Sequence, residues 1–261
     1  MELNLTGKTA LVCGSTAGIG KATALELAQL GAQIVLLARN PEKLEQTLRE
    51  LPRDFDEKHD SMAVDFSDTA GFETAIAALA QKHQFHILIN NTGGPAAGPA
   101  FEADPAQYAA AFAQHLLCNQ ILVQAVVPGM KKAHFGRIVN VISTSVKQPI
   151  ENLGVSNTIR GAVANWSKTL SVELGPFGIT VNNVLPGFTA TDRLEDIVNS
   201  AAKRMNKTPQ QARDFMTSVV PARRFAEAQE IAYGIAFLCS PSAGYINGIN
   251  LPIDGGRTKS L

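Results

Sequence analysis

The sequence predicts an α/β fold: a single doubly wound domain, residues 1–261, with a mostly or wholly parallel central sheet and helices on both faces. Three observations lead to this prediction. Short apolar, β-branched runs alternate with longer helical patterns along the whole chain, which indicates βαβ units. The runs are apolar at consecutive positions, as in strands that are buried on both faces. The length suits one large domain better than two small ones.

The strands are expected in chain order where these runs occur. They are Thr9–Cys13, Gln33–Ala38, Ser61–Val64, His86–Asn90, Gly136–Ser143, Gly178–Leu185 and a last strand within 247–256. Helices are expected between them, for example over 18–31, 106–130 and 157–174. In the last of these, five apolar residues recur at helical spacing and form one stripe: Ile159, Val163, Trp166, Leu170 and Leu174.

Composition narrows the possible functions. The chain carries 23 basic and 23 acidic residues, so its net charge is zero, and we expect neither nucleic acid nor an anionic membrane as a partner. No run reaches the roughly 18 consecutive apolar residues that span a bilayer, and the first residues lack the pattern of a leader peptide. The three cysteines, Cys13, Cys118 and Cys239, have no paired metal spacing, which favours a reducing, cytoplasmic location and predicts no metal site.

A glycine-rich turn follows the first strand. The stretch "VCGSTAGIG" places Gly14, Gly18 and Gly20 between that strand and the first helix. Residues without a Cβ let backbone N–H groups approach a phosphate, and the helix N-terminus adds positive potential. Three glycines alone are weak evidence, because many tight turns use them. Between a buried strand and a helix, however, they predict a Rossmann-type dinucleotide site.

The end of the second strand predicts which dinucleotide is bound. An NAD site usually has an acidic residue there, which binds the ribose 2′-hydroxyl. This chain has Ala38 followed by Arg39, and a guanidinium matches a 2′-phosphate in charge and geometry. The alternative is a solvated arginine at a strand end. We predict NADP(H), with NAD(H) as the less favoured cofactor.

Five ordered segments resemble the short-chain dehydrogenase/reductase family, in particular its 3-oxoacyl-carrier-protein reductases. They are "GKTALVCGSTAGIG", "LINNTGG", "GRIVNVIS", "GITVNNVLPGFTATD" and "GYINGINLPIDGG", and the resemblance extends over nearly the whole chain. It implies an NADP(H)-dependent oxidoreductase that acts on a small carbonyl or alcohol substrate and assembles as a homotetramer or dimer.

The resemblance also implies which residues hold the cofactor. The glycine turn would bind the pyrophosphate, Arg39 the 2′-phosphate, Asp65 the adenine and Arg160 the nicotinamide ribose. Asn91 and Gly93 would line the adenosine ribose, although an asparagine at a strand end often only ties loops together. The implied cofactor-binding residues are Gly14, Ser15, Thr16, Gly18, Ile19, Gly20, Arg39, Asp65, Phe66, Asn91, Gly93, Arg160, Pro186, Gly187, Thr189 and Thr191.

The candidate catalytic residues depart from the family pattern. The family has a serine at the position of Ser143 and a Tyr-x-x-x-Lys motif that begins thirteen residues later, where this chain has Ser156 and Arg160. A family asparagine on the preceding long helix is matched by His115. Of the four residues that the family uses, only Ser143 is kept.

The expected roles follow from the chemistry of these side chains. Ser143 hydrogen-bonds the substrate oxygen. Ser156 is a poor proton donor in place of tyrosine, because an aliphatic hydroxyl has a far higher pKa than a phenol, but it can hold a carbonyl or a water. Arg160, one turn further along the same helix face, supplies charge and hydrogen bonds but no proton. His115 is the best remaining acid, since imidazole titrates near neutrality; a packed, structural histidine is the alternative.

Two further features leave alternatives open. Residues 192–220 form a charged, amphipathic insertion beyond a strand end, where a substrate lid would lie; a pair of surface helices that cover the core is the alternative. The helices over 106–130 and 156–174 correspond to those that family members pair in tetramers. The apolar stripe of the first, formed by Phe112, Leu116, Val123 and Val127, is explained equally well by core packing.

The sequence supports two functions. The first is an NADP(H)-dependent oxidoreductase with an atypical active site made of Ser143, Ser156, Arg160 and His115. The second is a non-catalytic NADP(H)-binding sensor or assembly protein. Retention of Ser143 and of the Pro186–Gly187 turn favours the first, whereas the loss of both tyrosine and lysine favours the second. An enzyme of another reaction class on the same fold is a third reading, because a fold does not determine a function. The substrate is not identified.

Overall fold

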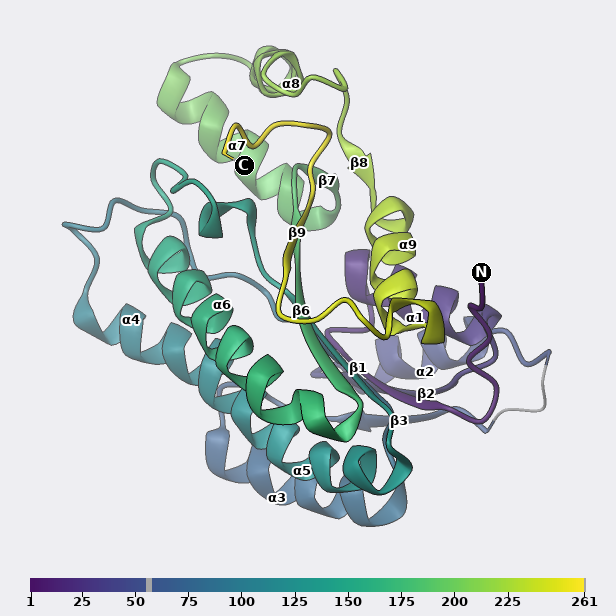
Figure 1. Ribbon diagram of the computed structural model, residues 1–261. Coiled ribbons are helices and arrows are strands. Elements are labelled where there is room, and N and C mark those ends of the chain that lie inside the picture. Colours follow the sequence, from purple (N-terminus) through teal and green to yellow (C-terminus); the bar gives the residue numbers. More distant parts are fainter. Residues whose placement is uncertain (55–57, 261) are drawn as a thin grey trace.

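In a computed structural model, which describes residues 1–54 and 58–260, the chain forms one open sheet with helices on both faces (Figure 1). The sheet has seven strands in the order β3-β2-β1-β4-β5-β6-β9, and each pair of neighbours is parallel. The strand order reverses between β1 and β4, which is the switch point where doubly wound sheets bind their ligands. The predicted fold class is confirmed.

The strands occupy the apolar runs of the sequence. They are β1 Thr9–Cys13, β2 Gln33–Ala38, β3 Asp60–Ala63, β4 Ile87–Asn90, β5 Gly136–Val141, β6 Ile179–Pro186 and β9 Asn250–Ile253. β5 ends two residues earlier than predicted, because the chain leaves the sheet before Ser143 and enters a 3₁₀ turn over Thr144–Val146. Ser143 therefore lies beyond the carboxyl end of its strand, at the edge of the sheet where ligands bind.

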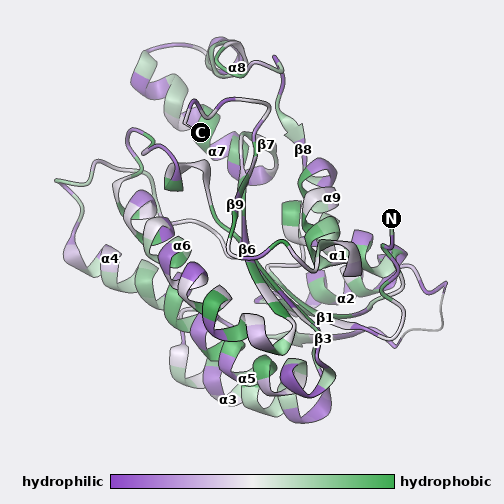
Figure 2. Cartoon of the chain, viewed as in Figure 1, coloured by the Kyte–Doolittle hydropathy of each residue, from purple (hydrophilic) through white to green (hydrophobic). Residues whose placement is uncertain are grey.

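Two sets of helices cover the sheet, each with its own hydrophobic core. Successive residues of β1 point to opposite faces, so that Ala10 and Val12 belong to one core and Leu11 and Cys13 to the other. Figure 2 shows hydrophobic colours along the central strands and mixed colours on the surrounding helices. One face carries α1 (Gly18–Gln29), α2 (Pro41–Glu50) and α9 (Ala228–Cys239); the other carries α3 (Thr69–Lys82), α5 (Cys118–Ala133) and α6 (Gly154–Leu174).

The helix before β5 is long and contains an irregular turn. α4 (Pro105–Phe112), a π-helical turn (Ala113–Leu117) and α5 follow one another without a break. By length and composition alone, Pro105–Ala133 is the one described helix that could cross a membrane. Some of its apolar side chains pack into the core beneath the sheet, among them Leu122 and Met130. The absence of a membrane partner stays a prediction.

Residues 192–220 form a separate helical layer above the carboxyl ends of the strands (Figure 1). α7 (Asp192–Met205) and α8 (Pro209–Ser218) pack on each other through a small apolar cluster that includes Val198 and Met216. The helical character expected of this segment is therefore present. We call residues 192–220 the lid segment; that it opens and closes over a substrate stays a prediction.

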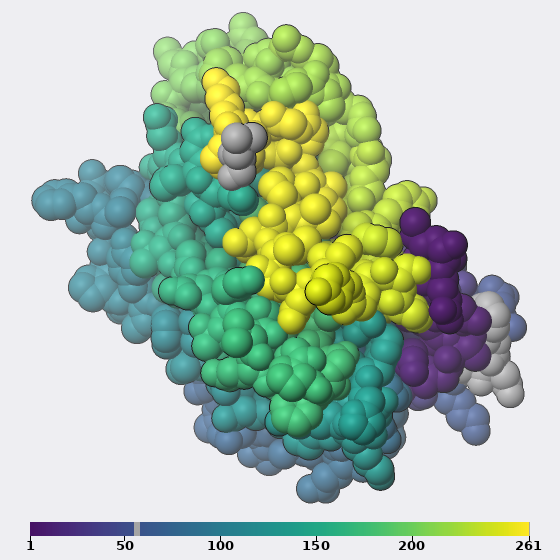
Figure 3. Space-filling model, in the orientation of Figure 1, coloured from purple at the N-terminus to yellow at the C-terminus, as the bar shows by residue number. Residues whose placement is uncertain are grey.

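Two short strands and the C-terminal tail join the lid segment to the sheet. β7 (Thr189–Ala190) precedes α7 and pairs in parallel with β8 (Ala226–Glu227), which precedes α9. Figure 3 shows the yellow C-terminal segment lying against the light green helices of the lid. Gly187 approaches the residue after β9 so closely that a Cβ on it would lie 2.7 Å from Asp254 Cα. The lid, the tail and the Pro186–Gly187 turn therefore meet at one end of the sheet.

A row of four asparagines, three buried and one partly buried, links the strands that carry the site. Asn90, Asn140, Asn183 and Asn250 are aligned across β4, β5, β6 and β9. Each amide donates to the next: Asn90 Nδ2 to Asn140 Oδ1 at 2.8 Å, Asn140 Nδ2 to Asn183 Oδ1 at 2.9 Å, and Asn183 Nδ2 to Asn250 Oδ1 at 2.8 Å. Because a buried amide without a partner is costly, this asparagine ladder favours one register of the strands.

Replacing Asn183 with alanine breaks the ladder at its centre and removes one partner each from Asn140 and Asn250. We expect the free energy of unfolding to fall by about 2–4 kcal/mol, because each unsatisfied buried polar group costs about 1–3 kcal/mol. Asn199→Ala, on the exposed surface of α7, is the control and should change little. Denaturant unfolding followed by circular dichroism measures both variants. If Asn183→Ala lowered the free energy of unfolding as little as Asn199→Ala, the role assigned to the ladder would be contradicted.

Candidate active site

The glycine turn packs against the end of β4 with no room for side chains. Gly14 has a φ of 58°, which is the left-handed region, and a Cβ on it would lie 2.6 Å from Asn91 O. A Cβ on Gly20 would lie 2.1 Å from Gly14 O. Asn91 Nδ2 donates to the carbonyl oxygens of Cys13 and Gly14, both at 3.3 Å. This side chain therefore ties the turn to β4, as the structural alternative for Asn91 expected.

α1 begins inside this turn and offers N–H groups to an anion. Its N-cap residue, Ala17, makes no side-chain cap, and the first helical turn has no acidic residue. Backbone N–H groups at a helix N-terminus, together with the helix dipole, favour a bound phosphate. A Cβ on Gly18 would lie 2.9 Å from Thr191 Cγ2 at the start of the lid, so the turn also touches the lid. These residues fit the pyrophosphate of a dinucleotide.

The other residues of the turn divide into structural and accessible ones. Ser15 is buried, and its hydroxyl donates to Leu37 O of β2 at 3.4 Å. Ile19 is partly buried and packs against the core beside α1. Thr16 is half-buried at the tip of the turn. Of these three side chains, Thr16 is the one placed to reach a cofactor phosphate.

At the predicted adenosine end of the site, one basic and one acidic side chain are exposed. Arg39 is exposed directly after β2, and Asp65 is exposed after β3. Hydrogen bonds from Ser67 lower the pKa of Asp65, and the positive charge of Arg39 adds to this effect, so the two side chains are near one another. Phe66 is buried, with its ring centroid 4.6 Å from that of Phe72, so its ring packs in the core; its contact with the cofactor stays a prediction.

Ser143 lines a cavity of about 850 Å³ at the other end of the site. The Pro186–Gly187 turn lines it too, as do Ala96 and Ala97 from the loop of small residues after β4. Gly93 is exposed at the start of that loop, with open space where a Cβ would be. The volume is in the range of small-molecule sites. This cavity is the candidate substrate site.

The hydroxyl group of Ser143 can donate a hydrogen bond to a ligand. Its hydroxyl oxygen accepts the N–H of Ser145 at 3.1 Å, which leaves the hydroxyl hydrogen available to another acceptor. The neighbouring threonines serve the local turn: Thr189 Oγ1 donates to Gly187 O at 3.2 Å, and Thr191 Oγ1 donates to Thr189 O at 3.3 Å. Ser143 is thus the one of these three whose hydroxyl hydrogen is not used among the described residues, while the hydroxyl oxygens of Thr189 and Thr191 can still accept from a ligand.

His115 and Arg160 meet at Thr92, behind the wall of the cavity. His115 is buried in the π-helical turn, where its Nδ1 lies 2.5 Å from Thr92 Oγ1. Arg160 is also buried; it donates to Thr92 O at 3.5 Å and to Val141 O at 3.1 Å. Ser156 is half-buried one turn earlier on α6. The structure therefore brings His115 and Arg160 together, while Ser143 alone of the four candidates lines the cavity.

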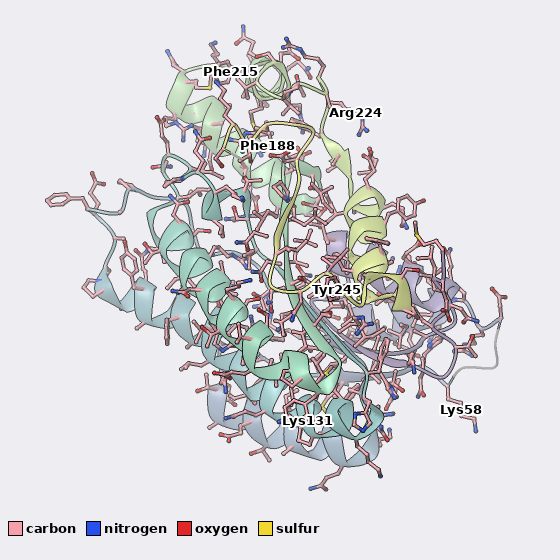
Figure 4. All side chains as sticks on the ribbon, viewed as in Figure 1. Lys58, Lys131, Phe188, Phe215, Arg224 and Tyr245 are labelled. Atoms are coloured by element: carbon pink, nitrogen blue, oxygen red, sulfur yellow. The ribbon has the colours of Figure 1, made fainter. Side chains whose placement is uncertain are left out.

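The cavity also includes residues that the sequence motifs did not identify. Figure 4 labels two aromatic ones, Phe188 after β6 and Phe215 on α8. The basic ones are Arg193 and Arg204 of the lid segment and Arg257 and Lys259 of the C-terminal tail. Within residues 1–54 and 58–260, no group of three or more His, Cys, Asp or Glu side chains is arranged to hold a metal ion.

Comparison with known proteins identifies the family. A family model described as enoyl-(acyl carrier protein) reductase matches residues 14–258. The NADPH-dependent reductase BacG of Bacillus subtilis is 33% identical over 98% of this chain and 100% of its own length. The 3-oxoacyl-[acyl-carrier-protein] reductase FabG of Haemophilus influenzae is 34% identical over 97% of this chain and 98% of its own length. The chain belongs to the short-chain dehydrogenase/reductase family.

A solved structure of this family agrees with the fold and the cofactor. L-sorbose reductase from Gluconobacter frateurii, complexed with NADPH and L-sorbose, has a TM-score of 0.92 against this chain, at 29% identity over the full length of both. BacG is also an NADPH-dependent enzyme. These relatives confirm the prediction of NADP(H) as the cofactor. The roles of Ser156, Arg160 and His115 remain predictions, since they rest on the residues of this chain.

The environment of His115 changes its expected chemistry. Burial, with a smaller contribution from the charge of Arg160, lowers the pKa of His115 to about 3. The ring is therefore neutral near pH 7, contrary to the sequence-based expectation that it titrates there. Its Nε2 has no hydrogen-bond partner among the described atoms. Burial beside the Arg160 guanidinium disfavours an imidazolium here, and the catalytic role of His115 stays a prediction.

Arg160 is a buried cation without a counter-ion. It forms no ion pair with any carboxylate that the structure describes. Burial and the nearby charge of Arg193 lower the pKa of Arg160 to about 10, so the guanidinium still carries its charge at neutral pH. The site therefore has net positive potential in the place where the family has a lysine.

The low pKa of His115 makes stability depend on pH. The folded-state pKa lies below the ordinary value of 6.5, so the contribution of neutral His115 is complete above pH 6.5 and is lost as the pH falls towards 3. The free energy of unfolding should fall by up to about 1.4 kcal/mol per pH unit in this window. His115→Gln should flatten this dependence, whereas His134→Gln at the exposed end of α5 should keep it. Denaturant midpoints between pH 4 and 7 measure how the free energy of unfolding depends on pH. The same pH dependence in wild type and His115→Gln would contradict the assignment to His115.

Proposed function

We propose that this protein is an NADP(H)-dependent reductase of a small carbonyl or alcohol substrate, with an atypical active site formed by Ser143, Ser156, Arg160 and His115. The observation that carries the proposal is the position of Ser143. It follows β5, lines the cavity of about 850 Å³ together with the Pro186–Gly187 turn, and keeps its hydroxyl hydrogen available. BacG and FabG, which are similar over nearly the whole chain, are reductases.

In this proposal the cofactor is held by the glycine turn with the start of α1, by Arg39 and by Arg160. When bound, NADPH supplies the hydride. The glycine turn and the first N–H groups of α1 bind the pyrophosphate, because they are close to the surface and unused by a side-chain cap. Arg39 binds the 2′-phosphate. Arg160 donates to the hydroxyls of the nicotinamide ribose.

The reaction needs stabilisation of negative charge on the substrate oxygen. Ser143 donates its hydroxyl hydrogen to that oxygen, and the nearby positive charge of Arg160 favours the developing charge. Neither Ser156 nor His115 supplies the proton itself, since the first has too high a pKa and the second is neutral. We assign Ser156 to holding a water that relays a proton from bulk solvent to the substrate oxygen. His115 is a positioning residue that acts through its hydrogen bond to Thr92.

We also propose that the lid segment covers the substrate. α7 and α8 contribute residues to the cavity wall, among them Ile197 and Met216. Arg193 at the start of α7 donates to Pro95 O at 2.9 Å, which connects the lid to the loop at the entrance. Closing such a layer excludes water from a site that stabilises charge.

A cytoplasmic homo-oligomer is the assembly we propose. Apolar side chains on the helices that family members pair stay exposed in the monomer: Phe112 is 40%, Leu117 is 43% and Val172 is 71% exposed. Pairing two copies along α4, α5 and α6 would bury them. The three cysteines are buried and free, which suits a reducing compartment.

Arg39 should determine the preference for NADPH over NADH. We expect Arg39→Asp to weaken NADPH binding by about 10- to 100-fold, because a charge-assisted contact worth about 1.5–3 kcal/mol is lost and repulsion is added. The Kd for NADH should stay the same or fall. Arg53→Asp makes the same charge change at another exposed position and is the control. Titration calorimetry measures each Kd; an equal loss for both dinucleotides would contradict the assignment.

Ser143 should be needed for turnover and not for cofactor binding. Following NADPH oxidation over a panel of aldehydes, ketones and 3-oxoacyl thioesters, we expect turnover of at least one class. Ser143→Ala should lower kcat by about 10²- to 10³-fold, as the loss of a single oxyanion donor does, with the Kd for NADPH unchanged. Ser242→Ala, at an exposed position, is the control. Tight NADPH binding by the wild type without turnover of any substrate would favour the non-catalytic binding protein instead.

A further inference from the structure

The cavity that Ser143 lines is more positive than the chain as a whole. Basic and acidic residues balance over the full sequence, with 23 of each. Of the described residues in the cavity wall, four are basic and two are acidic: Arg193, Arg204, Arg257 and Lys259 against Glu151 and Asp196. Apolar side chains such as Phe188 and Met216 form much of the remaining wall. A cavity of this kind suits a small ligand with an apolar body and a negative end.

Arg257 is held in place from two sides. Its guanidinium carbon lies 4.2 Å from the centroid of the Phe188 ring, a stacked arrangement that suits arginine. Its backbone belongs to a tight turn in which the Asp254 carboxylate accepts the N–H groups of Gly256 at 3.0 Å and Thr258 at 2.7 Å. Figure 4 shows Phe188 beside the C-terminal tail that carries this turn. The guanidinium is therefore pre-oriented in the cavity wall.

The charge of Arg257 has no partner in the part of the chain that the structure describes. It takes part in none of the ion pairs there, and the nearby Asp254 carboxylate is used by the backbone turn. Burial lowers the pKa of Arg257, while the charge of Asp254 opposes this effect. Arg224, close to the lid, is in contrast paired with both carboxylate oxygens of Glu230 at 2.6 Å. A half-buried guanidinium that pairs with no carboxylate among the described residues is a ready site for an anion.

We propose that Arg257 binds an oxyanion group of the substrate, a carboxylate or a phosphate, and so selects acidic over neutral carbonyl compounds. The proposal rests on the proposed reductase function, because it places the negative end of the substrate in the cavity whose wall includes Ser143. The planar fork of the guanidinium matches two oxygens of such a group. Arg204 and Lys259, which are exposed at the same cavity, add attraction from a distance.

Matched pairs of probes test the proposal. para-Carboxybenzaldehyde and methyl para-formylbenzoate share one aldehyde and differ in the negative charge; glyceraldehyde 3-phosphate and glyceraldehyde form the phosphate pair. Titration calorimetry, with and without saturating NADP⁺, gives a Kd for each. We expect at least one anionic probe to bind about 10-fold or more tightly than its neutral partner, because a charge-assisted pair forms. The pair with the larger ratio identifies which oxyanion is preferred.

Variants assign the preference to Arg257. Arg257→Leu should remove most of the acid-to-neutral ratio, Arg257→Lys should keep part of it, and Arg224→Leu, which alters an arginine already paired with Glu230, should keep all of it. The proposal would be overturned if, in both pairs, the two probes bound equally or neither probe bound. It would also be overturned if the acid-to-neutral ratio survived in Arg257→Leu. A failure of the reductase function is distinguishable: NADPH would not be bound or oxidised, while the ratio measured without NADP⁺ would persist.

Discussion

The close approach of the glycine turn to the end of β4 is the contact on which the site depends. Gly14 and Gly20 leave the space in which Asn91 bonds to the turn, and a Cβ on either glycine would overlap backbone or amide atoms. α1 consequently starts at the switch point of the sheet, with its first N–H groups unused by a side-chain cap. In the proposed function, the phosphate site is thus made by the backbone. It does not involve the side chains of Ser156 and Arg160. The glycine turn can therefore keep the family pattern while the catalytic residues depart from it.

Unpaired positive charge is the second organising feature. Arg39 lies at the adenosine end, Arg160 is buried between the two ends, and Arg257 lies in the cavity wall. Each is placed where a ligand can supply the negative charge. Burial, with a smaller contribution from the charge of Arg160, lowers the pKa of His115, so the described residues favour stabilising a negative oxygen over donating a proton to it. The proposed mechanism therefore relays the proton from bulk solvent through a water.

The strands, the glycine turn and the place of Ser143 could be predicted from the sequence, whereas most of the cavity wall could not. The runs at Thr9–Cys13 and Gln33–Ala38 coincide with β1 and β2, because consecutive apolar positions are a local property of buried strands. The glycine turn is likewise local. The pKa of His115, in contrast, depends on the burial of its ring and on the charge of Arg160, both of which arise only from the fold. Arg257 lies in the cavity wall because of the path of the C-terminal tail and its stacking on the Phe188 ring, so no sequence motif predicts its position.

A crystal structure of the complex with NADPH tests the central claim most directly. The account predicts that the pyrophosphate oxygens accept N–H groups from the turn and first residues of α1, that the 2′-phosphate lies against the Arg39 guanidinium, and that the nicotinamide reaches the Pro186–Gly187 turn beside Ser143. Density for the dinucleotide at another surface, or protein that stays free of NADPH at millimolar concentration, would contradict it.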